Sequence, residues 1–123
     1  MDIRGAVLDA LARRDQAAAR ALLSEVHRQK AFHLSDYYYG LKDALADAAR
    51  LHAYHIALMS VIGLGEPGPG VTGIDAELAK ALSQSLATCS EISGRQYGEG
   101  LGEFFAEVVK ELNSLVRELC SRS

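Results

Sequence analysis

The chain has 123 residues, about the size of one ordinary domain, and 49% of them are apolar, a composition that excludes a disordered protein. Thirteen Lys and Arg against 16 Asp and Glu give a net charge of −3, which provides no general attraction to nucleic acid or to an anionic membrane. Cys89 and Cys120 lack the CxxC spacing, so we expect free thiols in a cytoplasmic protein without a membrane segment or a cysteine-rich zinc site.

Helices dominate the predicted structure. Apolar residues recur three and four positions apart, while the clusters typical of strands are nearly absent, so we predict an all-α fold. The expected helices cover about 2–13, 15–32, 36–62, 75–92 and 101–120. The predicted N-caps, whose side-chain oxygens can accept from the free amides of the next turn, are Asp15, then Ser35 or Asp36, then Thr72 or Asp75.

A run of glycines and prolines, Gly63 to Gly70, is expected to end the third helix. Its first six residues fit the GxGxxG pattern, which binds pyrophosphate only between a strand and a helix start. Because this run follows a predicted helix, we interpret it as a linker. The sequence thus predicts one helical domain, with an N-terminal helix at 1–14, a first hairpin at 15–62, a Gly/Pro linker at 63–74 and a second hairpin at 75–120.

The two predicted hairpins resemble each other when the sequence is shifted by sixty residues. Eight positions are then identical, and both halves read Tyr-x-x-Gly-Leu-x-acid-x-apolar-Ala-acid-x-x-base from Tyr37 and Tyr97 onward. Two such hairpins, each with an apolar face that it cannot bury alone, predict an up-and-down bundle of about five helices. The alternative is that Ala-rich amphipathic hairpins look alike without a duplication.

The repeat also predicts which faces are buried. In the last helix the apolar stripe consists of Leu101, Phe104, Phe105, Val108, Leu112, Leu115 and Leu119, with Glu111 and Ser114 among the residues on the other side. Sixty residues earlier the same stripe becomes Leu41, Ala44, Leu45, Ala48, His52, His55 and Met59. Two histidines therefore occupy positions where the other half has leucines.

His52 and His55 are the main candidate site, because a buried imidazole needs hydrogen-bond partners for both nitrogens. Metal binding and proton transfer are the two functional interpretations, and a structural pair bonded to Tyr hydroxyls or carbonyls is the alternative. No Glu-x-x-His motif accompanies them. A carboxylate cage for metal could be formed by Asp43, Asp47, Glu103 and Glu107. The spacing of these residues to Arg50 and Lys110 fits ordinary surface ion pairs better.

The spacing of Arg50 and His55 resembles that of the Arg and His in some helical RNases of the HEPN class, which have four to six residues between the two. The resemblance implies a catalytic Arg50 and His55 in a polar cleft, usually completed across a dimer. Arg28 with His33 and Arg20 with His27 fit the same loose spacing, so it predicts a nuclease only as an alternative.

Tyr37, Tyr38 and Tyr39, with Tyr97 at the equivalent place in the second half, are typical of bundle packing or of a partner surface. No set of nucleophile, acid and base and no cofactor motif accompanies them. We therefore expect a non-enzymatic interaction or assembly subunit, a homodimer or bound to a protein partner, with no cofactor. The alternative is a small helical enzyme or metal-binding protein that uses His52 and His55.

Overall fold

The computed structural model describes residues 2–68, 75–95 and 100–122, and these form five α-helices and no strand. The helices are α1 (Ile3–Arg13), α2 (Gln16–Tyr38), α3 (Ala44–Leu64), α4 (Ala76–Gly94) and α5 (Leu101–Arg122). The prediction of an all-α helical bundle is confirmed.

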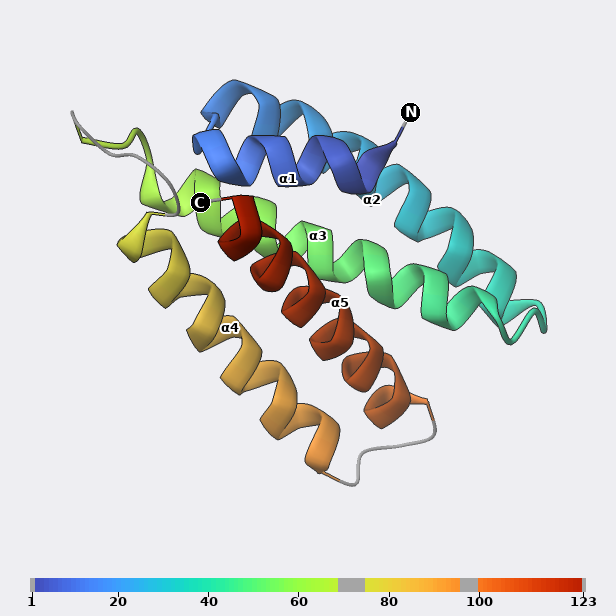
Figure 1. Ribbon diagram of the computed structural model, residues 1–123. Helices are drawn as coiled ribbons and strands as arrows, with labels where there is room; N and C mark the ends of the chain where they lie inside the picture. Colours follow the sequence, from blue (N-terminus) through green and yellow to red (C-terminus); the bar gives the residue numbers. More distant parts are fainter. Residues whose placement is uncertain (1, 69–74, 96–99, 123) are drawn as a thin grey trace.

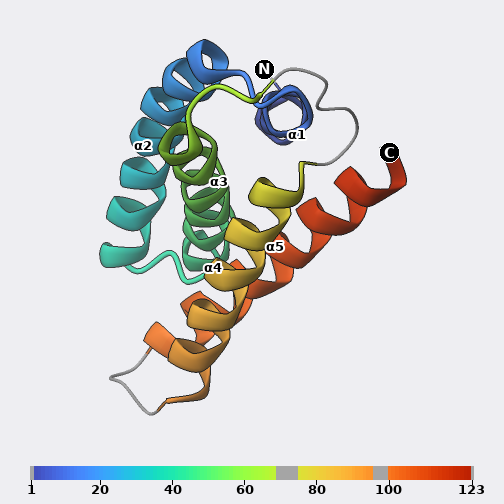
Figure 2. The same cartoon turned by 90° about the vertical axis from the view of Figure 1, so that its left-hand side faces the viewer.

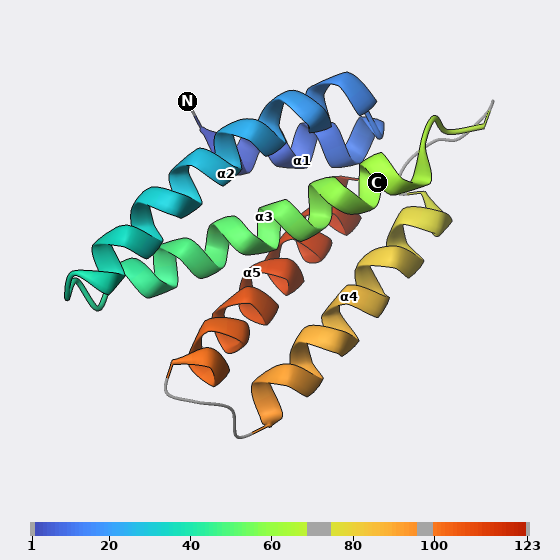
Figure 3. The same ribbon diagram turned by 180° about the vertical axis from the view of Figure 1, so that it is seen from behind.

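Helices α2 and α3 form one antiparallel hairpin, and α4 and α5 form a second (Figure 1). Helix α3 lies in the middle and packs against each of the other four helices, whereas α1 packs across α2, α3 and α5. The two hairpins lie close together near α1, and their far ends diverge (Figures 1 and 3). Figure 2, in which α1 is seen nearly end-on, shows the second hairpin slanting away from the first.

The core surrounds α3, whose fully buried residues face several neighbours: Ala44, Ala48, Ala49, Leu51, Ala53, Tyr54, Ala57, Leu58 and Val61. Because four helices contact α3, its buried face is wider than the single stripe of an outer helix. The prediction that the stripe from Leu41 to Met59 is buried, which was transferred from the last helix, is therefore partly wrong. Leu41, which precedes α3, is 62% exposed, and Met59 is 46% exposed.

In α5 the predicted stripe is buried over its second half, at Val108, Leu112, Leu115 and Leu119. Its first half lies where the two hairpins diverge, so fewer neighbours cover it. Phe104 and Phe105 are half-buried, and Leu101, which was expected in the core, is 39% exposed.

Aspartates begin two helices as predicted. Asp15 accepts a hydrogen bond from the backbone N–H of Ala18 at 3.0 Å, and Asp75 accepts from that of Glu77 at 2.8 Å. Each bond satisfies one of the free N–H groups of a helix start. Thr72, the alternative cap, lies outside the described residues.

The predicted break between the second and third helices is wrong. Ser35 and Asp36 cap no helix, because α2 continues through them to Tyr38 and α3 begins only at Ala44. The chain turns at Gly40, whose φ of 105° is a left-handed conformation that other residues adopt only with strain. The linker also starts later than predicted, since Gly63 is still inside α3 and Gly65, with φ of 73°, ends that helix. Residues 69–74 lie outside the described part.

Arg14 joins the ends of three helices. It follows α1 in a left-handed conformation, is only 4% exposed, and forms an ion pair with Asp75 at the start of α4. Its Nε donates to the carbonyl of Gly65 at 3.0 Å and its Nη2 to that of Leu64 at 2.9 Å. Burial raises the pKa of Asp75, but hydrogen bonds from Arg14 and the Glu77 amide outweigh burial and lower that pKa overall.

A second polar contact ties α1 and α3 to α5. Arg4 donates from Nε to Glu111 at 3.1 Å and from Nη2 to Ser114 at 2.8 Å, and the buried Tyr54 hydroxyl donates to the same Glu111 oxygen at 3.1 Å. Glu111 and Ser114 were predicted on the outer side of the last helix. The prediction is wrong because α1, which the repeat does not include, packs over that side.

Two landmarks recur sixty residues apart. Asp15 and Asp75 cap α2 and α4, and Gly40 and Gly100 both have a positive φ, of 105° and 88°. These landmarks agree with the internal repeat, whereas the different burial of the two stripes does not. The duplication therefore stays a prediction.

Candidate functional site

The two candidate histidines are part of a larger group of bases between α2 and α3. His52 and His55 lie one turn apart on α3, with ring centroids 5.4 Å apart, and α2 adds His27 and Lys30. The His27 ring meets the His55 ring edge-on, with centroids 4.4 Å apart. We call these four residues the histidine cluster.

The antiparallel hairpin explains how two distant segments meet in this cluster. Lys30 and His52 each lie eleven residues from Leu41, and His27 and His55 each lie fourteen residues from it. Because Leu41 lies in the turn, residues equally far before and after it face each other across the two helices. His27 and Lys30 were not predicted as part of the site, because the turn was expected several residues too early, near Ser35.

Lys30 is the centre of the histidine cluster. Its Nζ lies 3.0 Å from Nδ1 of His55 and 3.3 Å from Nδ1 of His52. An ammonium group only donates, so both Nδ1 atoms accept and the ring proton of each neutral imidazole is assigned to Nε2. Lys30 thus fixes the tautomer of both histidines.

Aromatic rings close one side of the cluster. The centroid of the His52 ring lies 5.5 Å from that of Phe104 and 5.9 Å from that of Phe105, both on α5. His52, His55 and Lys30 are half-buried, whereas His27 is exposed. The cluster is therefore covered by α5 on one side and reached by solvent near His27.

Burial and neighbouring bases keep the two inner histidines neutral. Burial, then the charge of Lys30 and the nearby His27, lower the pKa of His52 to about 4. The same causes, together with His52, lower the pKa of His55 to about 4. Burial also lowers the pKa of Lys30. At neutral pH the cluster thus holds one ammonium that donates to two uncharged imidazoles.

This geometry leaves no open ligand pair for a metal ion. Among the described residues, no group of three His, Cys, Asp or Glu side chains is placed to hold one. The Nδ1 atoms of His52 and His55 both accept from Lys30, so they bind a metal only if Lys30 moves away. The metal interpretation of these two histidines stays a prediction.

The structure does not bring Arg50 and His55 together. Arg50 forms an ion pair with Asp47, one turn earlier on the same helix. Five residues along an α-helix correspond to a rotation of about 140°, so the two side chains leave α3 in different directions. The other carboxylate oxygen of Asp47 lies 3.8 Å from Nδ1 of His33, which is on α2. The nuclease interpretation therefore lacks, within the described residues, the pairing of Arg50 with His55 that it requires.

Most tyrosines of the candidate surface are exposed at the turn between α2 and α3. Tyr38 is 81% exposed, Tyr39 is 82% exposed and Tyr37 is 36% exposed, while Tyr97 lies outside the described residues. Further exposed side chains lie in the same part of the molecule. We call the apolar end the following set: Phe32, Leu34, Tyr37, Tyr38, Tyr39, Leu41 and Leu101.

A hollow lies beside these residues. It has a volume of about 550 Å³ and is lined by Tyr37, Tyr38, Gly40, Lys42, Leu45, Gly100 and Glu103. It therefore lies between the α2–α3 turn and the start of α5. The sequence predicted the tyrosines as a candidate surface but not the hollow, because that depends on how the two hairpins diverge.

Comparisons with protein-family models, with curated proteins and with solved structures give no match for this chain. None of the helices in the described part is both long and apolar enough to cross a membrane.

Proposed function

We propose that the protein is a non-enzymatic assembly subunit that associates with a second copy of itself through the apolar end. The observation that carries this proposal is the exposure of large apolar side chains around one turn, above all Tyr38 at 81% and Tyr39 at 82%. From His27 to Tyr38 no residue of α2 is fully buried, and most side chains of this segment are exposed to solvent.

The area of the apolar end supports an interface between copies. A fully buried aromatic side chain covers roughly 150–250 Å², and the apolar end contains four aromatic and three Leu side chains. A stable dimer buries about 800 Å² per partner, and the exposed parts of these side chains, from 36% at Tyr37 to 82% at Tyr39, are the apolar area that this end offers.

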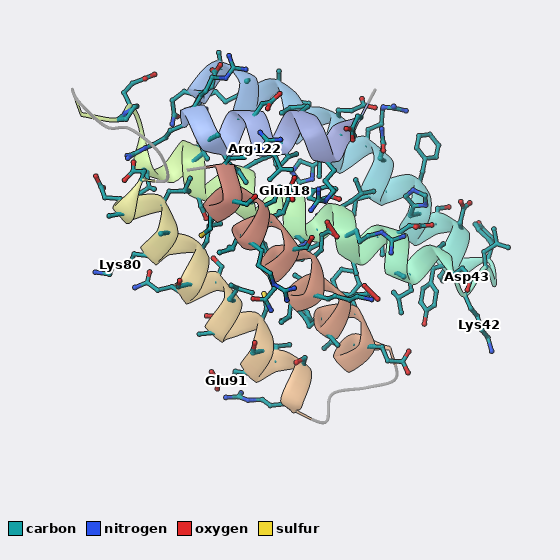
Figure 4. All side chains as sticks on the ribbon, in the orientation of Figure 1. Lys42, Asp43, Lys80, Glu91, Glu118 and Arg122 are labelled. Carbon is teal, nitrogen blue, oxygen red and sulfur yellow. The ribbon has the colours of Figure 1, made fainter. Side chains whose placement is uncertain are left out.

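The polar groups around the apolar end also favour a second copy. A twofold interface places the same surface on both sides, so that surface needs charges of both signs. Lys42 and Asp43 are neighbours at the end of the hairpin and both point outward (Figure 4). The tyrosine hydroxyls can both donate and accept. The hollow of about 550 Å³ is large enough to receive an aromatic ring from the other copy.

Sedimentation or light scattering over a range of concentrations tests this proposal. We expect a dimer that dissociates on dilution, and we expect Tyr38→Ser with Tyr39→Ser to weaken association by about tenfold or more, since aromatic anchors dominate such interfaces. Met59→Ser is the matched control, because Met59 is 46% exposed on α3 outside the apolar end. A monomer at every concentration, or an equal effect of the control, would contradict the proposal.

A further inference from the structure

The histidine cluster holds four basic side chains and no acidic one. In the described part of the chain, no Asp or Glu forms an ion pair with any of its four members. An ion pair between a histidine and a carboxylate, His33 with Asp47, lies outside the histidine cluster. The neighbouring Glu25 pairs with Arg28, and α5 contributes the uncharged rings of Phe104 and Phe105. A half-buried ammonium with only imidazole partners lacks the counter-charge that such groups normally have.

We propose that the histidine cluster is a binding site for a phosphate group. The Nδ1 atoms of His55 and His52 lie 3.0 and 3.3 Å from the Lys30 Nζ, and His27 extends the group toward solvent. A phosphate that enters beside Lys30 takes the ammonium protons as hydrogen bonds. The Nδ1 atoms of His52 and His55 then no longer accept from Lys30, and each takes up a proton from solvent. The resulting imidazolium groups donate through Nδ1–H to other phosphate oxygens.

The number and arrangement of donors favour phosphate over a carboxylate. The cluster brings four basic groups together from two helices, and their combined number of possible donors suits an anion with up to four oxygens. A carboxylate offers two oxygens in one plane and is better matched by the planar fork of an arginine. The phenylalanine rings on α5 exclude water from one side and so strengthen the attraction between the charges.

The depressed pKa values of His52 and His55 give the proposed site a pH dependence. Because a bound dianion favours the imidazolium form, phosphate must raise both pKa values, and by linkage a lower pH must tighten binding while phosphate stays doubly charged. This site does not depend on association at the apolar end, so either proposal can fail without the other.

Nuclear magnetic resonance of the histidine side chains tests this proposal on the full chain. Inorganic phosphate is titrated at constant ionic strength near neutral pH, with acetate as the carboxylate comparison. We expect phosphate, but not acetate, to move the His52 and His55 ring signals toward their imidazolium positions. Phosphoserine and a nucleoside monophosphate, titrated the same way, distinguish a protein-borne from a nucleotide-borne phosphate.

Lys30→Met keeps the aliphatic stem of the side chain and removes its charge, so we expect it to weaken phosphate binding by about tenfold or more. Lys80→Met is the matched control, because Lys80 points away from the bundle on α4 (Figure 4). Helical circular dichroism confirms that both variants fold. Ring signals that do not respond to phosphate, or equal phosphate affinities of the Lys30→Met variant and the unmodified protein, would overturn the proposal.

Discussion

Arg14 and Asp75 form a buried ion pair although 61 positions separate them in the sequence. Arg14 also donates to the carbonyls of Leu64 and Gly65, and Asp75 also caps α4. One pair of side chains therefore holds the end of α1, the end of α3 and the start of α4 together. These ends lie where the two hairpins are close to each other, which we call the closed end of the bundle. Buried pairs of this kind are costly to break from one side.

Removing one partner of this pair should strongly destabilise the protein. We expect Arg14→Met to lower the free energy of unfolding by about 3–5 kcal/mol, because it leaves the Asp75 carboxylate buried without its counter-charge. Urea unfolding followed by circular dichroism measures the loss. Asp75→Asn keeps an oxygen for the cap, so combining it with Arg14→Met should cost less than the sum of the two single changes.

The exposed pair of Arg28 with Glu25 provides the control for this comparison. Exposed ion pairs contribute about 0–1 kcal/mol, so Arg28→Met should leave the unfolding curve almost unchanged. If Arg14→Met were as mild as Arg28→Met, the closed end of the bundle would not depend on the buried pair.

Acid should destabilise the protein through the histidine cluster. The pKa values of His52 and His55 are about 4 in the folded chain and about 6.5 in an unfolded one, so the unfolded state binds more protons between these values. Stability is then fully present above about pH 6.5 and is lost as the pH falls toward 4. Since both rings are half-exposed, we expect a loss on the order of 1–2 kcal/mol, measured by thermal unfolding at a series of pH values.

Replacing both histidines, as His52→Gln with His55→Gln, should remove most of this pH dependence, because glutamine does not titrate and its oxygen can still accept from Lys30. His33→Gln is the matched control, since its ring faces Asp47 instead of Lys30. An unchanged slope in the double variant would show that other groups cause the acid sensitivity.

The Tyr54 hydroxyl should contribute to the contact between α3 and α5. Burial, with the charge and the hydrogen bond of Glu111, raises the pKa of Tyr54, so the hydroxyl stays protonated and donates. Tyr54→Phe removes a hydrogen bond to a charged group, and we expect a loss of about 1.5–3 kcal/mol in chemical unfolding. Tyr38→Phe, at a position that is 81% exposed, should have no measurable effect.

Three glycines should respond differently to alanine. Gly40→Ala and Gly100→Ala should each cost about 1 kcal/mol or more, because alanine is strained at φ of 105° and 88°. Gly100→Ala should cost more, since its Cβ would lie 3.0 Å from the Tyr37 hydroxyl oxygen. Gly63→Ala should stabilise by about 0.5–1 kcal/mol, because Gly63 is inside α3 with open space around it. The three melting temperatures, compared with that of the unmodified protein, test this order.

The sequence alone predicted the helices well where a cap or a breaker marks an end. The starts at Asp15 and Asp75 are correct because an aspartate side chain satisfies free N–H groups locally. The turn near Gly40 was misplaced, since Ser35 and Asp36 also suit a cap and only the packing of α2 along α3 decides between them. Propensity and capping compete at such positions, and tertiary contacts settle the outcome.

The candidate site was predicted in part. His52 and His55 stand out because they interrupt an apolar stripe at helical spacing. Their main partners, Lys30 and His27, come from the other helix of the hairpin, and the position of the turn, which was predicted too early, decides which residues of the two helices face each other. The pairing of Glu111 with Arg4 and Tyr54 likewise depends on where α1 packs, which no local pattern in the sequence determines.

The last three turns of α2 contribute no fully buried side chain, and this has a consequence for how the molecule opens. With no fully buried side chain from His27 to Tyr38, little free energy opposes local fraying there. Amide protons in this segment should exchange with solvent well before those of α3. Association at this end would fix the conformation of a segment that costs little free energy to rearrange. The two copies can therefore adjust to each other there, while the remaining helices of each copy keep their shape.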